Sequence, residues 1–351
     1  MAADEDDNVE VESGGDRKVK DFRNYSLKAH NTFGIDVECS RFLEYETVDE
    51  AQKIATILRE SVMPFIIIGG GSNLLLTKDF EGIVVHSAIK GIAFEGNRMH
   101  CGSGETWDDV VDRSLRHGLF GLENLSLIPG DVGASAVQNI GAYGVEVQSF
   151  IRKVHAVEIA TGKATVIDGE QCGYGYRDSR FKHDWKNRYL ITAVEYELLS
   201  SFEPRLVYGN ICSELERKGI SQPSAMQVRD TIIDIRNAKL PDPKETGNAG
   251  SFFMNPVVSR GKYEQLAAQY EGMPHYDVDA AHVKIPAGWM IDQCGWKGKS
   301  LGRAGVHDKQ ALVLVNMGGA TGAEIVALSD AIRKDVKAKF GIDIYPEVNI
   351  V

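Results

Sequence analysis

The stretch FIIIGGGSNLLL, residues 65–76, decides which nucleotide-binding fold this chain can adopt. Its first four residues are apolar and predict a short buried strand, and three glycines follow directly. The Rossmann fingerprint needs a further glycine at the position of Leu74, so that fold is excluded. The glycine turn lets backbone N–H groups converge on an anion such as a pyrophosphate, with Ser72 and Asn73 as added donors. For this segment alone, an ordinary tight turn between strands is the alternative.

A second glycine-rich segment covers residues 121–144, GLENLSLIPGDVGASAVQNIGAYG. Its long uncharged runs are too apolar for a solvated loop, and its glycines are too frequent for a regular helix. The segment therefore predicts close approach of the backbone to a large flat ligand or to a neighbouring part of the chain. A buried crossover connection is the alternative.

Composition places the chain among ordinary globular proteins, because 43% of its 351 residues are hydrophobic and 25% are charged. The formal net charge is −11, but residues 1–16 carry many acids and no Lys or Arg, and the rest of the chain is nearly balanced. Nucleic-acid binding is disfavoured because no basic field attracts a polyanion. The sequence shows no signal peptide and no apolar run of ~18 residues, so we expect a cytoplasmic protein without membrane insertion.

Cysteine and histidine spacing gives no local metal motif. The 5 cysteines lie far apart without a CxxC pair, and the 9 histidines show neither HxxxH nor HxH spacing. The sequence therefore predicts no disulfide framework and no metal site.

The order of predicted elements favours an α+β fold with two domains. Residues 1–20 form an acidic tail that we expect to be disordered, residues 21–201 a first domain split into two subdomains near residue 88, and residues 202–351 a second domain. Its last strand, predicted over 342–351, returns to the active site. Helix starts are predicted at four capping sequences, which begin at Thr47, Thr106, Ser224 and Thr321.

Strands are predicted around residues 83–85 and 92–94, and in the alternating run YLITAVEYELL, residues 189–199. A hairpin is predicted over 154–167, with its turn at 161–162. Mixed helices and strands without a fixed repeat support the α+β class over a doubly wound sheet.

Five further motifs accompany the two glycine-rich segments: NTFG (31–34), GYRDSRFK (175–182), KLPDPK (239–244), GNAGSFFMNP (247–256) and AGWMIDQCG (287–295). Together they resemble the MurB family, the UDP-N-acetylenolpyruvoylglucosamine reductases. The seven segments occur in the family's order and span everything beyond the acidic tail.

The resemblance implies an FAD-binding domain of the vanillyl-alcohol-oxidase type, which is not Rossmann, followed by a C-terminal substrate-binding domain of the longer family type with a tyrosine loop. It implies an enzyme that uses FAD and NADPH to reduce the enolpyruvyl group of a UDP-sugar to UDP-N-acetylmuramate. This reaction serves peptidoglycan synthesis, and hence cell-wall biogenesis, cell shape and cell division. A monomer is expected. The alternatives are an FAD-dependent oxidase on the same fold and a non-catalytic protein that binds a UDP-sugar or a flavin.

The resemblance also assigns roles to residues. Cofactor contacts fall to Gly69, Gly70, Gly71, Ser72, Asn73, Gln138, Asn139 and Gly141, and substrate contacts to Tyr208, Lys239, Asn255 and Gln310. The catalytic residues are Arg177, Ser251 and Glu347, expected in a cleft where the domains meet. A fixed guanidinium suits an enolate, and a positioned hydroxyl can supply the final proton.

Taken without the resemblance, each catalytic residue has a plainer interpretation. Arg177 and Asp178 could form a surface ion pair, Ser251 could be a turn or cap residue, and Glu347 could be a solvated side chain. The chain also departs from many relatives at two positions, with Met254 in place of lysine and Ala136 in place of proline.

Overall fold

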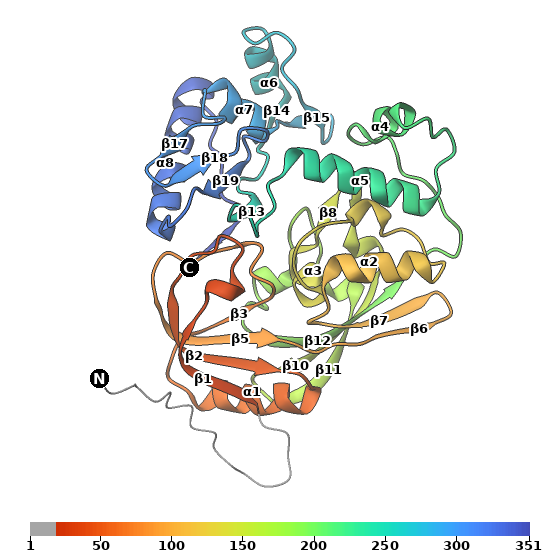
Figure 1. Cartoon of the computed structure of the whole chain (residues 1–351), viewed down its shortest axis with the longest axis vertical. Coiled ribbons are helices and arrows are strands. Elements are labelled where there is room, and N and C mark those ends of the chain that lie inside the picture. Colours follow the sequence, from red (N-terminus) through yellow and green to blue (C-terminus); the bar gives the residue numbers. More distant parts are fainter. Residues whose placement is uncertain (1–18) are drawn as a thin grey trace. The chain divides into compact units, whose positions relative to one another are not determined.

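The computed structural model describes residues 19–351, so most of the predicted acidic tail lies outside the described part. Lys20, which was assigned to that tail, already begins strand β1 (Figure 1). The chain divides into two compact units. The first holds residues up to Tyr25 with Cys39–Gly69 and Phe80–Arg229, and the second holds Ser26–Glu38, Gly70–Asp79 and Asp230–Val351.

These compact units differ from the predicted division at 201/202. Residues 202–229 belong to the first unit, because Ala225 joins its hydrophobic core and Arg229 pairs with Asp108 at 2.6 Å. Two N-terminal segments belong to the second unit instead. Whether the functional domains follow the predicted boundary stays a prediction.

The first unit contains two sheets. The four-stranded sheet has the order β1-β2-β5-β3 and is built from β1 (Lys20–Ser26), β2 (Glu38–Tyr45), β5 (Phe80–Ser87) and β3 (Phe65–Ile68). The five-stranded sheet has the order β11-β10-β12-β7-β6 and is built from β11 (Lys163–Asp168), β10 (Ile151–Glu158), β12 (Tyr189–Glu197), β7 (Arg98–Gly102) and β6 (Ile92–Glu95). In the first sheet β2, β5 and β3 run parallel, whereas neighbours in the second are antiparallel.

Helices cover both faces of the five-stranded sheet. Helix α1 (Val48–Glu60) packs on one face, where Val157 and Leu190 share its core cluster, and α2 (Trp107–Arg116) and α3 (Val132–Gln138) share a core with Val154 and Val194 on the other. Alternation along the strands produces this separation, because successive side chains point to opposite faces. This unit also contains the hairpin of β8 (Gly141–Ala142) and β9 (Val145–Glu146), and α4 (Ile211–Arg217). Helix α5 (Ala225–Lys239) carries the chain into the second unit.

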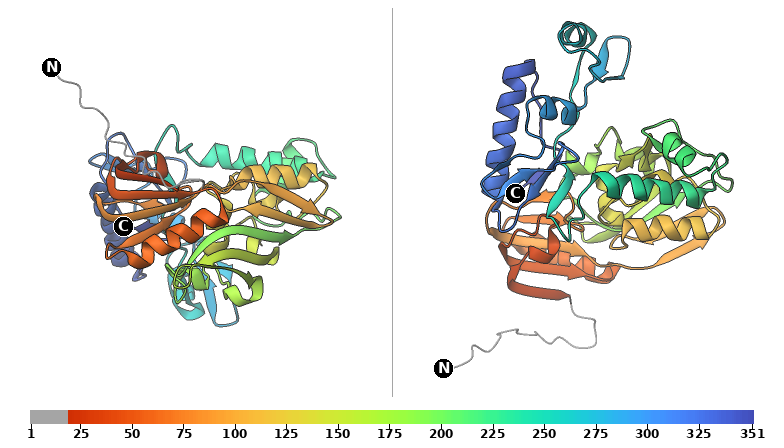
Figure 2. Two further views of the ribbon diagram at one scale, coloured as in Figure 1. Left: turned by 90° about the horizontal axis from the view of Figure 1, so that it is seen from below. Right: turned by 45° about the horizontal axis from the view of Figure 1, so that its top comes forward.

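The second unit packs helices on short strands around one core. Its sheets are β13-β19-β18-β17, β14-β16-β15 and β20-β4, made of β13 (Asn248–Ser251), β19 (Val313–Asn316), β18 (Ala304–Val306), β17 (Ser300–Leu301), β14 (Val257–Ser259), β16 (His282–Lys284), β15 (Tyr276–Asp277), β20 (Asn349–Ile350) and β4 (Leu74–Leu75). Its helices are α6 (Arg260–Ala267), α7 (Ala287–Gln293) and α8 (Gly322–Phe340), of which α8 is the long dark-blue helix at the upper left of the right view of Figure 2. No helix within residues 19–351 is both long and apolar enough to span a bilayer.

The capping predictions are largely confirmed. Side chains of Thr47, Ser224 and Thr321 each accept a hydrogen bond from the backbone N–H three residues later. Thr106 begins α2 as predicted but forms no such bond. There the adjoining backbone is tied to residues 130–132 instead, and Thr106 itself forms a bridge with Asp131.

Two predictions were wrong in detail. The strand predicted over 342–351 is regular only at β20, because Pro346 lacks an N–H and forms only an isolated bridge with Phe253. Residues 121–144 also contain a helix, α3, despite their glycines. Gly133 fits there because its N–H donates to Ser103 O at 2.8 Å and a Cβ would lie only 3.1 Å from the Ser103 Cβ.

Candidate functional site

The glycine turn after β3 packs closely on helix α3. A Cβ on Gly69 would lie 2.9 Å from the Ala134 Cβ and 3.6 Å from Asp131 Oδ2, so only glycine allows this approach. The two segments predicted to hold the cofactor, 65–76 and 121–144, therefore meet in the first unit. The boundary between the compact units passes directly after Gly69.

Arg177 lies against the second of these segments. Its Nη2 donates to Gly141 O at 2.5 Å, and a Cβ on Gly141 would lie 3.0 Å from Nη1. The Arg177 backbone has φ 54°, a left-handed conformation that is costly for a residue with a side chain and often marks functional sites. The structure thus brings a predicted catalytic residue to a predicted cofactor residue.

The turn that carries Arg177 is held by its neighbours. Gly175 and Asp178 exchange backbone hydrogen bonds of 3.0 and 3.1 Å, and Ser179 Oγ donates to Val137 O at 2.6 Å. The Asp178 carboxylate contacts His183 Nε2 at 2.7 Å. The aspartate of the suspected Arg177–Asp178 surface pair therefore contacts His183, while the guanidinium is directed to Gly141.

Asn139 is a buried junction at the end of α3. Its amide donates to Gly175 O at 2.7 Å and to Glu146 Oε2 at 3.1 Å, and its carbonyl accepts from the Gln148 N–H at 3.1 Å. Its backbone is left-handed, with φ 43°, which asparagine tolerates better than most residues. The side chain of Asn139 thus joins three segments, and its contact with a cofactor stays a prediction, as does that of Gln138.

Sequence reasoning missed a charged cluster beside Gly69. His86, at the carboxyl end of β5, contacts Glu44 Oε2 at 2.8 Å and Asp131 Oδ2 at 3.6 Å. Burial opposes a charge on the imidazole, but hydrogen bonds to Asp131 and Glu44 raise the pKa of His86 to about 9. The only sequence signal was a histidine at the end of an apolar strand, a position that often carries function in parallel sheets.

In the second unit, the NTFG motif is packed between two glycine-containing segments. A Cβ on Gly71 would lie 2.0 Å from His30 O, and a Cβ on Gly247 would lie 2.2 Å from Phe33 O. Thr32 connects both neighbours, because its N–H donates to Gly71 O at 3.1 Å and its carbonyl accepts from the Asn248 N–H at 3.0 Å. Three motifs that are far apart in the sequence therefore form one backbone assembly.

Ser251 and Glu347 lie on adjoining segments of this unit. The Glu347 N–H donates to Phe252 O at 2.8 Å, so the residue after Ser251 is bonded directly to the backbone of Glu347. Asn73 is bonded to the segment of Glu347, because its Nδ2 donates to Glu347 O at 3.3 Å and its backbone carbonyl accepts from the Asn349 N–H at 3.1 Å. Ser251 ends β13 and is exposed, as its proposed chemistry requires.

Two predicted substrate residues meet at the start of α7. Asn255 Oδ1 accepts from the Ala287 N–H at 2.9 Å, and Gln310 Oε1 would lie 3.1 Å from a Cβ on Gly288. Lys239, a third such residue, is exposed at the end of α5 in the same unit.

Tyr208, the fourth predicted substrate residue, lies in the first unit. Its Cβ is 3.4 Å from the position that a Cβ on Gly144 would take, so its loop packs over the end of the 121–144 segment. Asn124, fully buried, fixes both neighbours by donating to Tyr143 O at 2.9 Å and to Arg205 O at 2.8 Å. Nearly half of the Tyr208 surface is exposed.

The two departures from the family pattern fall at different places. Ala136 is fully buried in the core of the first unit. Met254 is half-buried beside Ser251, and its N–H donates to Tyr345 O at 2.9 Å. Neither departure falls at one of the three predicted catalytic residues.

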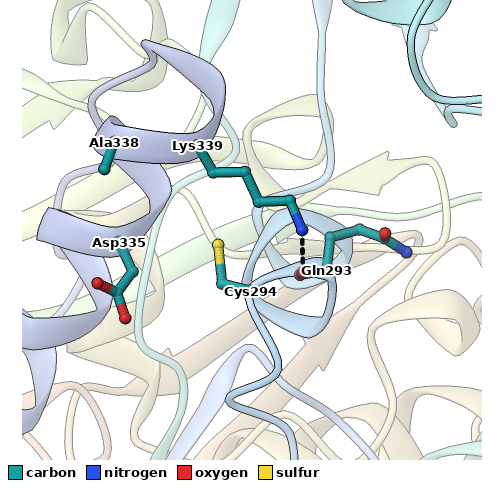
Figure 3. A pocket seen from close by; sticks show the side chains of 5 residues that line it. All are labelled: Gln293, Cys294, Asp335, Ala338 and Lys339. Atoms are coloured by element: carbon teal, nitrogen blue, oxygen red, sulfur yellow. Dashed lines mark hydrogen bonds between the residues drawn. The ribbon is translucent and has the colours of Figure 1, made fainter.

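A separate pocket lies on the second unit. It has a volume of about 350 Å³ and is lined by Gln293, Cys294, Asp335, Ala338 and Lys339 (Figure 3). Lys339 Nζ donates to Gln293 O across it. None of the predicted site residues lines this pocket, so we do not place the predicted site there.

The structure therefore assembles two groups. Within the first unit it gathers Gly69, Asn139, Gly141, Arg177 and Tyr208 around α3 and the 121–144 segment, and within the second it joins Asn73, Ser251 and Glu347. That Arg177 meets the other two catalytic residues stays a prediction.

Comparison with known proteins matches two segments of the chain to family models. Residues 242–351 match the family model described as UDP-N-acetylenolpyruvoylglucosamine reductase, C-terminal domain, and residues 40–169 match that of an FAD binding domain. A protein named UDP-N-acetylenolpyruvoylglucosamine reductase from Bacteroides fragilis is 54% identical over 333 residues, which cover 93% of this chain and 99% of the relative. One with the same name from Burkholderia multivorans is 45% identical over 330 residues, covering 92% and 95%.

A solved structure shows the same fold. The crystal structure of UDP-N-acetylenolpyruvylglucosamine reductase from Thermus caldophilus matches with a TM-score of 0.66 at 22% identity, covering 95% of this chain and 98% of that one. The α+β class is confirmed, with an FAD-binding domain followed by the C-terminal domain of the reductase family.

Proposed function

Because the chain belongs to the UDP-N-acetylenolpyruvoylglucosamine reductase family, we propose that it reduces the enolpyruvyl group of UDP-N-acetyl-3-O-(1-carboxyvinyl)-glucosamine to UDP-N-acetylmuramate. NADPH is the electron donor, FAD is the cofactor, and the product enters peptidoglycan precursor synthesis. The observation that carries the proposal is the 54% identity over 93% of the chain and 99% of the relative. A match of this extent leaves no large part of the relative without a counterpart.

The glycine-rich segments have the chemistry that FAD needs. A turn of three glycines followed by Ser72 and Asn73 supplies backbone amides, a hydroxyl and a side-chain amide, which suit a pyrophosphate. Close packing at Gly69 and Gly141 leaves no room for a Cβ, so glycine is required at both positions. When bound, FAD supplies the hydride that the reaction requires.

We assign Arg177 to the charge that develops on the substrate. Addition of a hydride to the terminal vinyl carbon leaves negative charge that spreads into the adjacent carboxylate, and a guanidinium is a permanent cation with bidentate donors. The bond from Nη2 to Gly141 O supports this role, because it holds the guanidinium beside the predicted cofactor segment.

We assign Ser251 as the proton donor and Glu347 as the group that assists it. A hydroxyl is a weak acid, so it can serve only when it is held close to a strongly basic carbon. The backbone bond between Phe252 and Glu347 supports this pairing, because it keeps both residues on adjoining segments. Tyr208, Lys239, Asn255 and Gln310 complete the proposal as contacts for the UDP-sugar.

A comparison of Ser251→Ala with Ser300→Ala tests the assignment. Ser300 is exposed in β17 of the same unit and is the matched control. We expect Ser251→Ala to keep its FAD and to accept electrons from NADPH at the normal rate, while reducing the enolpyruvyl substrate at least ~100-fold more slowly. Ser300→Ala should behave as the unmodified protein.

Other outcomes separate the alternatives. Normal turnover by Ser251→Ala would remove that residue from the mechanism without touching the overall reaction. Rapid reaction of the NADPH-reduced protein with oxygen, and none with the enolpyruvyl nucleotide, would instead identify an oxidase. A colourless protein that binds the UDP-sugar in calorimetry would identify a non-catalytic binding protein.

The cytoplasmic location and the monomeric state belong to the same proposal. NADPH is a cytoplasmic reductant, which favours that location. Sedimentation equilibrium of the full chain tests the monomer, and a mass that rises with concentration would contradict it.

A further inference from the structure

Three neighbouring strands of the five-stranded sheet bring two histidines and a glutamate together. His100 on β7 is paired with Glu195 on β12, and His155 on β10 is paired with Ala193, two residues before Glu195. Residues that are paired, or two apart on a strand, point to the same face of a sheet. All three side chains therefore lie on one face, although they are 40 to 95 residues apart in the sequence.

The atoms of this cluster that can bind a metal are close together. Each side chain offers one nitrogen or oxygen, and these three atoms all lie within 4.8 Å of one another. His155 Nε2 is 4.0 Å from Glu195 Oε2, and the two imidazole rings meet edge to face with centroids 4.9 Å apart. Within residues 19–351 this is the one group of three such side chains at these distances.

Two buried polar atoms of the cluster lack hydrogen-bond partners. His155 Nε2 and Glu195 Oε1 are both shielded from solvent, and no described residue forms a hydrogen bond with either. Buried polar atoms without hydrogen bonds cost free energy, so such a pair on one face of a sheet calls for an explanation. A cation held by the imidazoles and the carboxylate would compensate this cost.

Burial also disfavours a charge on the His155 imidazole. Burial is the largest influence that lowers the pKa of its imidazole, and the nearby His100 and Lys153 lower it further against the opposing effect of Glu195. A neutral imidazole keeps a lone pair for a metal ion.

We propose that His100, His155 and Glu195 form a binding site for a divalent transition-metal ion of the Zn²⁺, Ni²⁺ or Cu²⁺ class. Two imidazoles and one carboxylate are donors that these ions accept, whereas Mg²⁺ and Ca²⁺ prefer oxygen ligands. Small side-chain rotations bring the three atoms to bonding distance, about 2 Å from a common centre, and water completes the coordination. The site lies outside the residues assigned to flavin and substrate, so it does not depend on the proposed function.

Arg98 is expected to lower the affinity of this site for a metal ion. Its Nη1 is 3.6 Å from Glu195 Oε1, so a metal ion must share the carboxylate with a guanidinium. Like charges in proximity repel, and the affinity is therefore lower than that of an isolated site with the same ligands. Removal of the Arg98 charge should therefore strengthen metal binding. A cluster that is only solvated and holds no ion would show no such change.

A bound ion would connect β7, β10 and β12. Because the ligands come from three strands, the ion binds the folded sheet and not the unfolded chain, and it should stabilise the protein. Saturating Zn²⁺ should raise the melting temperature of the full chain by about 5 °C.

The test uses the full chain with its flavin, freed of metal by a chelator. Titration with Zn²⁺ in a calorimeter should show one ion per chain, and His155→Gln should weaken it at least ~10-fold. Glu195→Gln, which preserves the shape of the side chain, should weaken Zn²⁺ binding to a similar extent. This second variant tests the site even if His155→Gln folds poorly. Arg98→Gln should strengthen binding about threefold. With Cu²⁺, electron paramagnetic resonance should show hyperfine coupling to two imidazole nitrogens, and to one after His100→Gln.

His282→Gln is the matched control. His282 is an exposed histidine that contacts the Asp279 carboxylate at 3.0 Å, so the control removes a histidine beside a single acidic group. It should leave the Zn²⁺ affinity unchanged. The proposal is overturned if the unmodified chain takes up no Zn²⁺, or if the double variant His100→Gln/His155→Gln binds it as well as the unmodified chain does.

Discussion

The two compact units hold their predicted site residues by different means. In the first unit, side chains form connections: Asn139 bonds to two other segments, and the guanidinium of Arg177 binds Gly141 O. In the second unit, close backbone packing is added to side-chain bonds such as that from Asn73 to Glu347 O: Gly71 and Gly247 lie so close to the NTFG motif that a Cβ would overlap it, and Glu347 is bonded to Phe252 through main-chain atoms.

This difference indicates which kind of substitution should destabilise each unit. Where backbones are in contact, the residue must lack a Cβ, because side-chain rotation cannot relieve the clash of an added methyl group. Where side chains hold the segments, a substitution leaves buried polar groups without partners. The predicted catalytic side chains of the second unit should therefore be changeable with little structural damage, and this is why Ser251→Ala is an informative test.

The largest expected effect breaks the backbone assembly. Gly71→Ala places a Cβ 2.0 Å from His30 O at φ +65°, and should lower the free energy of unfolding by about 4 kcal/mol. Gly34 has the same φ of +65° with open space around it, so Gly34→Ala should cost only about 1 kcal/mol. Urea titration followed by circular dichroism measures both, and equal losses would mean that backbone strain rather than contact governs Gly71.

A smaller effect is expected for the side-chain junction of the first unit. Asn139→Ala removes three hydrogen bonds made by a fully buried side chain and should cost about 3 kcal/mol. Asn187 is the control, because it also has a left-handed backbone, with φ 58°, but makes one exposed bond to Phe65 O. Asn187→Ala should cost less than about 1 kcal/mol. If the two losses were the same, the loss at Asn139 would reflect backbone conformation and not its bonds.

The smallest effect concerns the charged cluster beside Gly69, and it depends on pH. The pKa of His86 rises from 6.5 to about 9 on folding, so its stabilisation is complete below pH 6.5 and is lost as the pH rises through about 9. His86→Gln should therefore lower stability by on the order of 2 kcal/mol at pH 6 and much less at pH 10.

Thermal unfolding of His86→Gln and of a control across this pH range measures that effect. The control is His183→Gln, because His183 is an exposed residue that contacts one carboxylate, Asp178. Its pH curve should follow that of the unmodified chain within about 0.5 kcal/mol. A loss in His86→Gln that stayed constant with pH would show that packing, and not charge, determines the contribution of His86.

Local sequence signals predicted elements well where the physics is local. The caps at Thr47, Ser224 and Thr321 were found because a hydroxyl and an N–H three residues apart form a bond whatever surrounds them. Helix α3 was not predicted because its glycine, Gly133, is required by close packing on Ser103, which lies about 30 residues away in the sequence. The strand predicted over 342–351 was too long because its pairing partners, Phe253 and the β4 strand, are remote.

The sequence by itself determined the family, the α+β class and the motifs that carry the proposed chemistry, because these reside in residue types and their order. Only the tertiary structure decided which groups meet: Arg177 with Gly141, Asn73 with Glu347, and the His100, His155 and Glu195 cluster. No rule on the spacing of residues in the sequence predicts these contacts. Residues on separate strands become neighbours through sheet register, which depends on the burial and pairing of many other side chains at once.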